Sequence, residues 1–553
     1  MNKKKIVSII LGATMLTSSM ASITSATAVS RDLSSSGTIH IIDDGIPDNK
    51  NIGWDYNEDT KVLTFIGKGA IPDYPDSDNV DKKTWFKKDE VTEATKIVIS
   101  NGITKIGSNC FNGMANVEEV DAPTVKQIGS NAFNGCEALN TLSAPSIQSV
   151  GSYAFNDCKS LSTFTAGKNM TYIGDYAFNN CESLRSVTGD GKVRVRNYSF
   201  SNCSSLTTFN LPNATEIGSY CFDNSSLLRT VKVPKATIKS NGFSTNAEQG
   251  VSTVVAGSLD NKAFYQNKRI KNLTLDNATF IGNYALAEAT GLSTITANKV
   301  TSVGNSAFKD TNITEVNLGK VSKIDNYAFA GCKKLVKANL GTKISSVGSG
   351  AFVNCFSLNS TITLKNATSI GTNAFANCQN IRVADNSLGN KLKSIGSNAF
   401  AGCNKISSLY IPKTTTTIGS NLSSKIESVN DTSVTVTSNT ERIKIYTPYN
   451  STIYKKYIAN KHNKSYIRKA VTSLKLSKSR VSLSKGKKVR LTWTITSNAD
   501  NKGLTFITDN TKVAKFSTSG YITAKGKGTC YVSIKSRDGS NKVAKCKVTV
   551  KWR

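Results

Sequence analysis

Residues 136–155 read CEALNTLSAPSIQSVGSYAF, and variants of this stretch recur along most of the 553-residue chain. The recurring anchor is an Ile or Val followed by Gly, as in Val150-Gly151, with a Phe five residues after the Ile or Val, as at Phe155. Fifteen such anchors, four of them degenerate, follow one another at intervals of 21 to 25 residues. Internal periods of this length are typical of solenoid proteins.

Two further positions of the unit recur with the same spacing. Eight units have a Cys three residues after the Phe, and a Leu or Ile follows three residues later, as at Cys158 and Leu161. One unit of about 22 residues cannot bury these side chains alone, whereas stacked copies cover one another. The pattern therefore predicts a mainly β solenoid of about fifteen coils. We expect the Gly after the Ile to permit a turn that other residues resist.

The unit resembles the BspA-like, treponemal-type leucine-rich repeats, whose pattern C-x-x-L-x-x-I-x-I-P-x-x-V-x-x-I-G-x-x-A-F is matched from Cys136 to Phe155. The resemblance extends from about Ile103 to Gly419 and implies caps at both ends. Trp54 and the stretch 63–69 are similar to the N-terminal cap of that family, and 443–467 is similar to its closing strand–helix–strand. It also implies a surface protein that binds host or bacterial partners.

The C-terminal segment has a different pattern. From Val471 onward, short alternating strands such as 489–493 and 548–550 are separated by turn residues, which favours a small β-sandwich. The stretches 510–516 and 520–529 resemble the bacterial immunoglobulin-like group 2 domain. That resemblance implies a spacer or an adhesive unit of a cell-surface protein.

The first residues are typical of an export signal. Lys3 to Lys5 precede an apolar run over 6–16, and Ala26-Thr27-Ala28 is a small-residue cleavage site. The run is well short of the ~20 residues that span a bilayer, so we expect secretion, with no transmembrane segment and no LPxTG-type wall anchor. The expected division is 1–28 signal peptide, 29–102 N-terminal region and cap, 103–430 solenoid, 431–470 C-terminal cap and 471–553 immunoglobulin-like domain.

Charge is concentrated at one end of the chain. The formal net charge is +32, and the segment from Arg442 to Arg553 has 27 Lys and Arg against three acids. This asymmetry predicts an anionic partner such as cell-wall polymer, anionic polysaccharide or lipid headgroups. The alternative is that the charge serves solubility or reflects composition alone. Base-stacking aromatic residues are not concentrated there, so we expect no nucleic-acid partner.

The outward side chains of the repeat strands form the candidate ligand-binding face. Strand side chains alternate, so these residues flank the inward apolar one, and most are small, hydroxylated and uncharged. The two interpretations are an inert solvated face and a platform for a protein or glycan. The candidate residues are Thr141, Thr163, Thr165, Thr208, Asn210, Thr294, Thr296, Glu315, Asn317, Thr361, Thr363 and Tyr410.

Other reactive residues give weaker signals. The recurrent cysteines are expected to be packed thiols, with bridges between adjacent coils as the alternative. Cys530 and Cys546 lie on two arms of an expected hairpin and are candidates for a disulfide. Four acids in one loop are a weak calcium candidate without EF-hand spacing, the alternative being a solvated acidic loop: Asp73, Asp76, Asp78 and Asp81.

No convergent catalytic set or cofactor motif stands out, so we expect no enzyme and no cofactor. We expect a monomeric, secreted or extracellular protein of adhesin type, held at the cell wall without a covalent link. Its repeats would contact a protein or glycan, and its basic module would act as a spacer or as a tether to anionic cell-wall polymer. The alternative is a structural surface-layer or matrix component without a specific ligand. An enzyme is the remote alternative.

Overall fold

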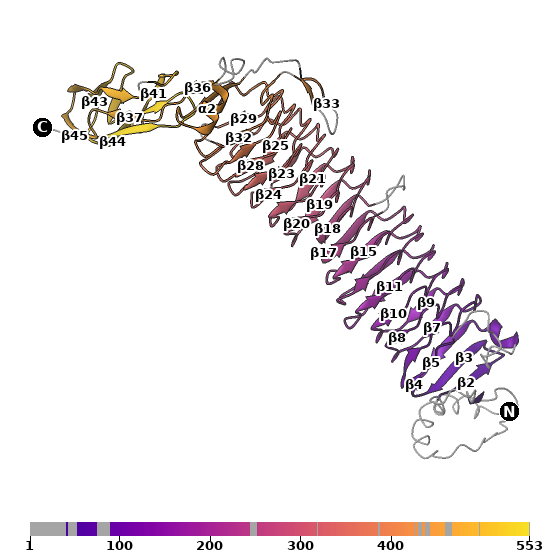
Figure 1. Ribbon diagram of the computed structural model, residues 1–553. Coiled ribbons are helices and arrows are strands. Elements are labelled where there is room, and N and C mark those ends of the chain that lie inside the picture. Colours follow the sequence, from indigo (N-terminus) through magenta and orange to yellow (C-terminus); the bar gives the residue numbers. More distant parts are fainter. Residues whose placement is uncertain are drawn as a thin grey trace.

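The computed structural model describes residues 40–41, 52–74, 89–243, 251–317, 319–384, 387–424, 426–429, 434–436, 443–458, 467–496 and 498–551. These residues form a long rod of stacked coils with a small sandwich at its C-terminal end (Figure 1). Their regular structure is almost entirely β, with one 3₁₀ helix, η4 (Asp89–Glu93), and one α-helix, α2 (Thr452–Ile458). The predicted fold class is confirmed.

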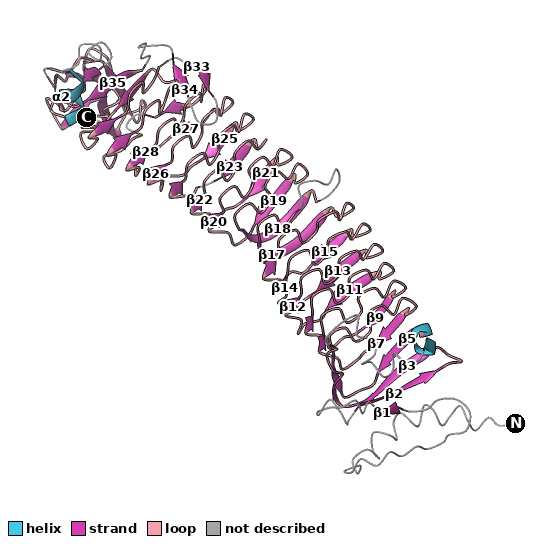
Figure 2. Cartoon of the chain, turned by 45° about the vertical axis from the view of Figure 1, so that its right-hand side comes forward, coloured by secondary structure: helices cyan, strands magenta, loops and turns pink. Residues whose placement is uncertain are grey.

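Most coils contribute a strand of three or more residues to one side of the rod and a two-residue strand to the other (Figure 2). Most equivalent strands of successive coils pair in parallel and in register, so that Thr163 is opposite Ser186 and Ile173 is opposite Val195. Each repeat position therefore lies on the same position of the next coil. This is the arrangement that the periodic sequence requires.

The longer strands and the short strands form two series along the rod. The longer ones are β5 (Lys96–Ile99), β7 (Glu119–Asp121), β9 (Thr141–Ser143), β11 (Thr163–Ala166), β13 (Ser186–Gly189), β15 (Thr208–Asn210), β17 (Thr230–Ile238), β18 (Thr253–Leu259), β19 (Asn272–Leu275), β21 (Thr294–Thr296), β23 (Glu315–Asn317), β25 (Lys337–Asn339), β27 (Thr361–Ile362), β29 (Arg382–Val383) and β31 (Ser408–Tyr410). The short ones are β4 (Gly69–Ala70), β6 (Ile103–Ile106), β8 (Gln127–Ile128), β10 (Ser149–Val150), β12 (Tyr172–Ile173), β14 (Arg194–Val195), β16 (Glu216–Ile217), β20 (Phe280–Ile281), β22 (Ser302–Val303), β24 (Lys323–Ile324), β26 (Ser346–Val347), β28 (Ser369–Ile370), β30 (Ser394–Ile395) and β32 (Thr417–Ile418).

The repeat phenylalanines form the centre of the core. Phe155, Phe178 and Phe200 are fully buried, and the centroids of adjacent rings are 5.1 Å apart in both pairs. A second stacked run extends from Phe308 to Phe400. Leu286 takes the aromatic position between the two runs and is also buried. The core is thus a nearly continuous ladder along the axis of the rod.

The recurrent cysteines are buried free thiols that also make a specific hydrogen bond. The Sγ of Cys181 donates to the carbonyl oxygen of Phe155 in the preceding coil at 3.2 Å, and Cys203 makes the same contact with Phe178 at 3.1 Å. Ser225 occupies this position in the next coil, and its hydroxyl donates to Phe200 at 2.7 Å. In these coils the position holds a small side chain that donates a hydrogen bond, whereas the sequence pattern predicted only a small packed thiol; Ala289, without a donor, occupies it in the coil of Leu286.

This hydrogen bond predicts different costs for two replacements of Cys181. Cys181→Ser is expected to change the free energy of unfolding by no more than about 1 kcal/mol, because serine keeps the donor. Cys181→Ala removes the donor and leaves a small cavity, so we expect a loss of about 1–2 kcal/mol. Urea denaturation followed by circular dichroism measures both. Equal losses for the two variants would show that the donor contributes nothing.

The glycine of the anchor has a role that differs from the expected one. Gly151 does not adopt a left-handed backbone conformation, but a Cβ at this position would lie 2.6 Å from the carbonyl carbon of Gly129. The left-handed residue comes two positions later, as at Tyr153 with φ of 56°. The turn expectation was therefore wrong, because glycine is required here for close approach of the backbones of adjacent coils.

Both ends of the solenoid are covered. At the N-terminal end, β2 (Ile52–Asn57) and β3 (Val62–Gly67) form an antiparallel hairpin whose second strand pairs with β5, and β1 (His40–Ile41) pairs with β2. At the other end, β35 (Lys444–Thr447) and β36 (Ile467–Lys469) extend the sheet from β31, with α2 between them. A separate hairpin joins β33 (Ile426–Val429) to β34 (Val434–Val436).

The C-terminal module is a sandwich around one core. One sheet has the order β38 (Arg480–Ser484), β45 (Val543–Lys551), β44 (Gly528–Ser536) and β41 (Leu504–Thr508). The other sheet has the order β39 (Lys488–Arg490), β43 (Tyr521–Ala524) and β42 (Ala514–Phe516), and β37 (Leu474–Leu476) pairs with β40 (Trp493–Ile495). In the part of the chain that the structure describes, no helix is long and apolar enough to span a bilayer.

Candidate ligand-binding surfaces

The middle of the candidate face is one continuous parallel sheet. Strands β11, β13, β15, β17, β18, β19 and β21 pair in register, which aligns their outward residues in two rows. We call these rows the hydroxyl rows: Thr163, Ser186, Thr208, Thr230, Thr253, Asn272 and Thr294 in the first, and Thr165, Thr188, Asn210, Lys232, Val255, Thr274 and Thr296 in the second. Lys232 is the single charged residue in them.

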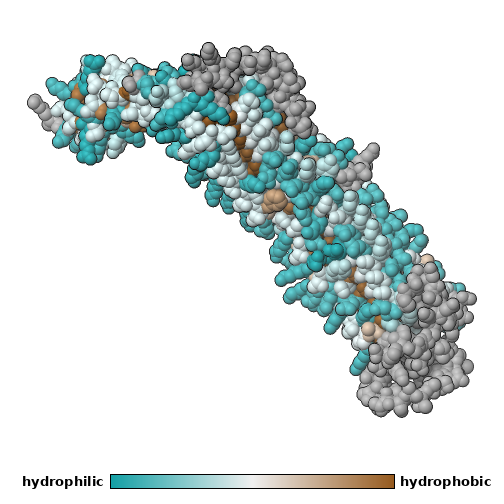
Figure 3. Space-filling model, viewed as in Figure 1, coloured by the Kyte–Doolittle hydropathy of each residue, from teal (hydrophilic) through white to brown (hydrophobic). Residues whose placement is uncertain are grey.

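Charged residues begin where this sheet ends. Strands β21 and β23 belong to different sheets, and beyond this break Glu315 lies opposite Lys337 and Asn317 opposite Asn339. On the N-terminal side, Glu119 is opposite both Lys96 and the exposed Thr141. Farther along, Thr361 is exposed and Thr363 is partly buried. The section with Lys232 as its single charge is therefore bounded at both ends by charged residues. Figure 3 shows only small, separate apolar patches on the visible side of the rod.

Tyr410 differs from the other candidate residues because it lies at the junction with the C-terminal module. A Cβ at Gly539, in the turn between β44 and β45, would lie 3.2 Å from the Cβ of Tyr410. Burial and the nearby Asp538 carboxylate raise the pKa of the Tyr410 phenol. Asp538 is itself buried and accepts a hydrogen bond from the backbone N–H of Val471. Tyr410 is thus a docking residue between the two parts of the chain.

A ladder of tyrosines, which sequence reasoning missed, lies beside the same coils. Tyr153, Tyr176, Tyr198 and Tyr220 stack with centroid separations of 4.8, 4.7 and 5.0 Å, and we call them the tyrosine ladder. Tyr153 is 39% exposed and the other three are partly buried. Stacking covers the inner ring faces, and the Tyr220 hydroxyl accepts a hydrogen bond from the Asn241 side-chain amide at 3.1 Å. Burial and the neighbouring tyrosines raise the pKa of Tyr176 and Tyr198.

The signal for this ladder was present in the sequence. Each of the four tyrosines precedes the repeat phenylalanine by two residues, at the left-handed turn position, where Asn131 and Asn241 stand in other coils. Asparagine adopts this conformation readily, whereas tyrosine does so less often. Four consecutive tyrosines at a position that favours asparagine indicate a role other than turn formation.

The calcium and disulfide candidates have specific surroundings. Asp73 accepts hydrogen bonds from the ammonium of Lys105 at 2.7 Å and from the backbone of Ser108 at 2.6 Å, and these contacts lower its pKa against the effect of burial. The other three acids of that loop, Asp76, Asp78 and Asp81, lie outside the described residues. Within the described ranges, no three His, Cys, Asp or Glu side chains gather where they could share a metal ion.

Cys530 and Cys546 lie on adjacent strands and are free, buried thiols in the structure. The register places Cys530 opposite Val548 and Cys546 opposite Val532, so the two cysteines are not a directly opposed pair. Burial raises the pKa of both thiols. Both side chains contribute to the sandwich core.

The surface of the C-terminal module is basic on both sheets. On the first sheet, Arg480 pairs in register with Lys547, and Lys545 and Lys551 project from the same strand as Lys547; all four are exposed. On the second sheet, Lys488, Arg490 and Lys515 are exposed. The three acids of the module all accept backbone hydrogen bonds: Asp500 from Lys469, Asp509 from Tyr531 and Asp538 from Val471. Each of these three carboxylates is therefore engaged in a hydrogen bond with the backbone.

A leucine-rich-repeat solenoid followed by an immunoglobulin-like module is the class of protein that this architecture defines. The sequence model of the BspA type leucine rich repeat region matches residues 83–194, 126–248, 257–382 and 383–483. The chain therefore belongs to the BspA-type leucine-rich-repeat family. The bacterial Ig-like domain (group 2) matches residues 470–548. Both resemblances seen in the sequence are confirmed, and both families are typically non-enzymatic binding or structural modules.

Several solved structures are similar to the chain. A leucine-rich repeat protein from Bacteroides ovatus is 21% identical, with 67% of this chain and 91% of that chain covered and a TM-score of 0.39. A leucine rich cell surface protein from Faecalibacterium prausnitzii is 18% identical (68% and 94%, TM-score 0.26). The pneumococcal vaccine antigen PcpA is 15% identical (78% and 97%, TM-score 0.29). No curated protein sequence matches the chain.

Proposed function

We propose that this chain is a secreted, cell-surface-associated binding protein of adhesin type. Its middle coils contact a protein or glycan, and its basic module is a spacer or an electrostatic tether to anionic cell-wall polymer. It acts as a monomer without a cofactor and is not an enzyme. The observation that carries the proposal is that the hydroxyl rows and the tyrosine ladder occupy the same coils, from Tyr153 to Thr230.

The two features offer a partner different contacts, the hydroxyl rows on the longer strands and the tyrosine ladder at the turns that follow the short strands. Tyrosine is enriched among the residues that dominate binding energy at interfaces. Hydroxyl groups on a regular sheet exchange hydrogen bonds with a partner at little electrostatic cost, because Lys232 is the only charge in the rows that would have to be desolvated. Repeat solenoids use such extended surfaces for recognition. The middle coils, rather than the charged ends of the face, are therefore the proposed contact region.

The test is an array of matrix proteins and glycans probed with the full chain and with the double variant Tyr176→Asn/Tyr198→Asn. Asparagine occupies the same left-handed position at Asn131 and Asn241, so the substitutions preserve the turn. We expect saturable binding to at least one arrayed partner and a loss of about 30-fold in affinity for the variant, since two hot-spot residues are removed.

Tyr284→Asn is the matched control. Tyr284 occupies the same turn position and is 39% exposed, but it lies outside the tyrosine ladder. It is expected to leave binding unchanged. A chain that binds nothing on the array in a saturable way would favour the structural surface-layer or matrix role. Equal losses for the control and the double variant would contradict the proposed contact region.

A further inference from the structure

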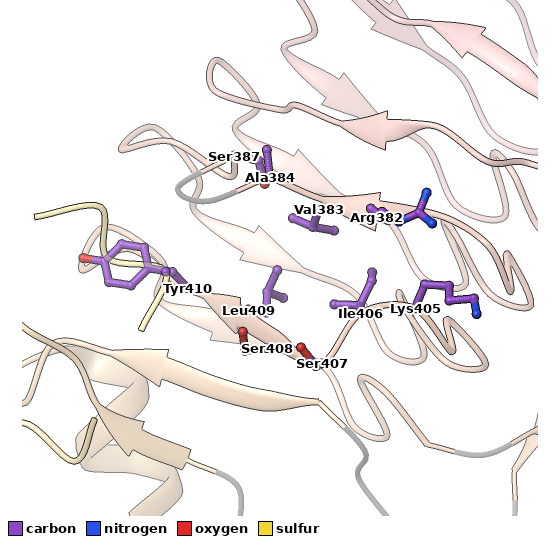
Figure 4. Close-up of a pocket in the computed structure, with 11 residues that line it drawn as sticks. Arg382, Val383, Ala384, Ser387, Lys405, Ile406, Ser407, Ser408, Leu409 and Tyr410 are labelled. Carbon is purple, nitrogen blue, oxygen red and sulfur yellow. The ribbon is translucent and has the colours of Figure 1, made fainter. Parts of the chain in front are cut away.

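A cavity of about 240 Å³ opens on the longer-strand side of the rod, next to the C-terminal module. Strands β29 and β31 belong to different sheets, whereas the short strands of the same coils, β30 and β32, pair directly. The coils therefore touch on one side and separate on the other. We call the resulting cavity the junction slot, and Figure 4 shows it between Val383 on β29 and Leu409 on β31.

One end of the junction slot is formed by two distant parts of the chain. Tyr410 closes it from the solenoid, and Gly539 of the C-terminal module packs against Tyr410. Binding sites often lie at such junctions between domains. The cavity is somewhat smaller than the ~300–1,000 Å³ typical of sites for drug-sized molecules. It therefore suits a single sugar unit better than a long chain.

A buried hydroxyl group without a partner lines this slot. Ser387 is 2% exposed, and its Oγ has no hydrogen-bond partner among the described residues. Buried polar groups in native proteins are almost always hydrogen-bonded, because an unpaired one costs stability. Figure 4 shows this hydroxyl above the space between the two strands. It is therefore placed to bond a polar molecule in the slot.

Positive charge lies at the end of the slot opposite Tyr410. Arg382 and Lys405 are both exposed there, and Figure 4 shows them at the same end of the slot, on its two opposite sides. Arg382 uses one of its N–H groups to donate to Asn359 Oδ1 at 2.7 Å. Among the described lining residues there is no Asp or Glu. Asp385 and Asn386, between Ala384 and Ser387, lie outside the described residues.

We propose that the junction slot binds one acidic sugar unit. Its carboxylate pairs with Arg382 and Lys405, and its hydroxyl groups bond to Ser387 and to the polar groups of β31. Arginine is suited to this role because its planar guanidinium binds carboxylates through two parallel hydrogen bonds. The slot is separate from the tyrosine ladder and the hydroxyl rows, so this proposal and the proposed function can fail independently.

The experiment is isothermal titration of the full chain with three sugars: glucuronate, N-acetylneuraminate and neutral glucose. We expect at least one acidic sugar to bind at millimolar concentration and glucose to bind at least tenfold more weakly. The two acidic sugars distinguish a uronic acid from a sialic acid as the preferred unit. Equal affinity for glucose and both acids, or no binding of either acid at millimolar concentration, would overturn the proposal.

Variants then assign the binding to these residues. The double variant Arg382→Gln/Lys405→Gln is expected to lose at least tenfold in affinity, whereas Lys337→Gln, an exposed cation on the same side of the rod, is expected to leave it unchanged. An equal loss from Lys337→Gln would place the binding elsewhere and overturn the proposal.

Ser387→Ala separates binding from folding. Because the hydroxyl is unpaired in the free chain, its removal should raise the melting temperature slightly while weakening the sugar several-fold. Ser424 is the matched control, since its buried Oγ is also without a partner but lies outside the slot. Ser424→Ala should raise the melting temperature and leave the affinity unchanged. If Ser387→Ala bound the acidic sugar with unchanged affinity, Ser387 would not contact the sugar and the slot would not be its binding site.

Discussion

Phe178→Ala is expected to lower the free energy of unfolding by about 3–5 kcal/mol. The Phe178 ring is fully buried and stacks on Phe155 and Phe200, and Phe164 packs against it with a centroid separation of 4.5 Å. Its removal leaves a cavity that the neighbouring coils cannot fill, because their backbones are fixed by in-register pairing. Urea denaturation followed by circular dichroism measures the loss.

Phe280→Ala is the matched control, because Phe280 is 41% exposed on a short strand. Its replacement should change the free energy of unfolding by no more than about 0.5 kcal/mol. Since each coil contacts only its neighbours, the cavity at Phe178 should also separate the unfolding transitions of the coils on its two sides. Similar losses for the two variants would contradict the stacked core.

The second large effect is expected from the basic module. Replacing Arg480, Lys545, Lys547 and Lys551 with Gln should weaken binding to a poly(glycerol phosphate) teichoic acid by about 10²- to 10³-fold at low salt, since each cation near an anionic surface contributes about 1 kcal/mol. The salt dependence of the remaining binding should also become shallower, because fewer counterions are released. Titration of the full chain at several salt concentrations measures both.

Four exposed solenoid lysines provide the control for total charge. Gln at Lys126, Lys268, Lys333 and Lys365 removes the same charge from the rod and should change teichoic acid binding little. A comparable loss from this control would mean that net charge, rather than the module surface, holds the polymer. In that case the tether role of the module would be wrong.

The core of the fold could be predicted from the sequence because the same positions of the repeat are buried in successive coils. Ile173, Phe178, Cys181 and Leu184 each lie on their counterparts in the next coil, so one period describes the whole interior. The repeat pattern did not reveal that the cysteines donate hydrogen bonds, although Ser225 at a cysteine position was a visible sign of this. The role expected for Gly151 was wrong because the distance between the backbones of adjacent coils cannot be read from a sequence.

The candidate surfaces were less predictable for a different reason. The hydroxyl rows follow from strand alternation, so Thr163 and Thr165 could be placed on one face. The tyrosine ladder depends on a turn whose direction was unknown, and Tyr410 was assigned to the open face because nothing in its coil reveals the module that covers it. Its contact with Gly539 joins residues far apart in the chain and appears only in the folded protein.

Array binding of the full chain at high salt tests most directly whether the middle coils contact the ligand. High salt screens the contacts of the basic module with polyanions. We expect saturable binding to a protein or glycan to persist under these conditions and to be lost in Tyr176→Asn/Tyr198→Asn. Binding that disappears at high salt, or that the double variant retains at full strength, would contradict this expectation.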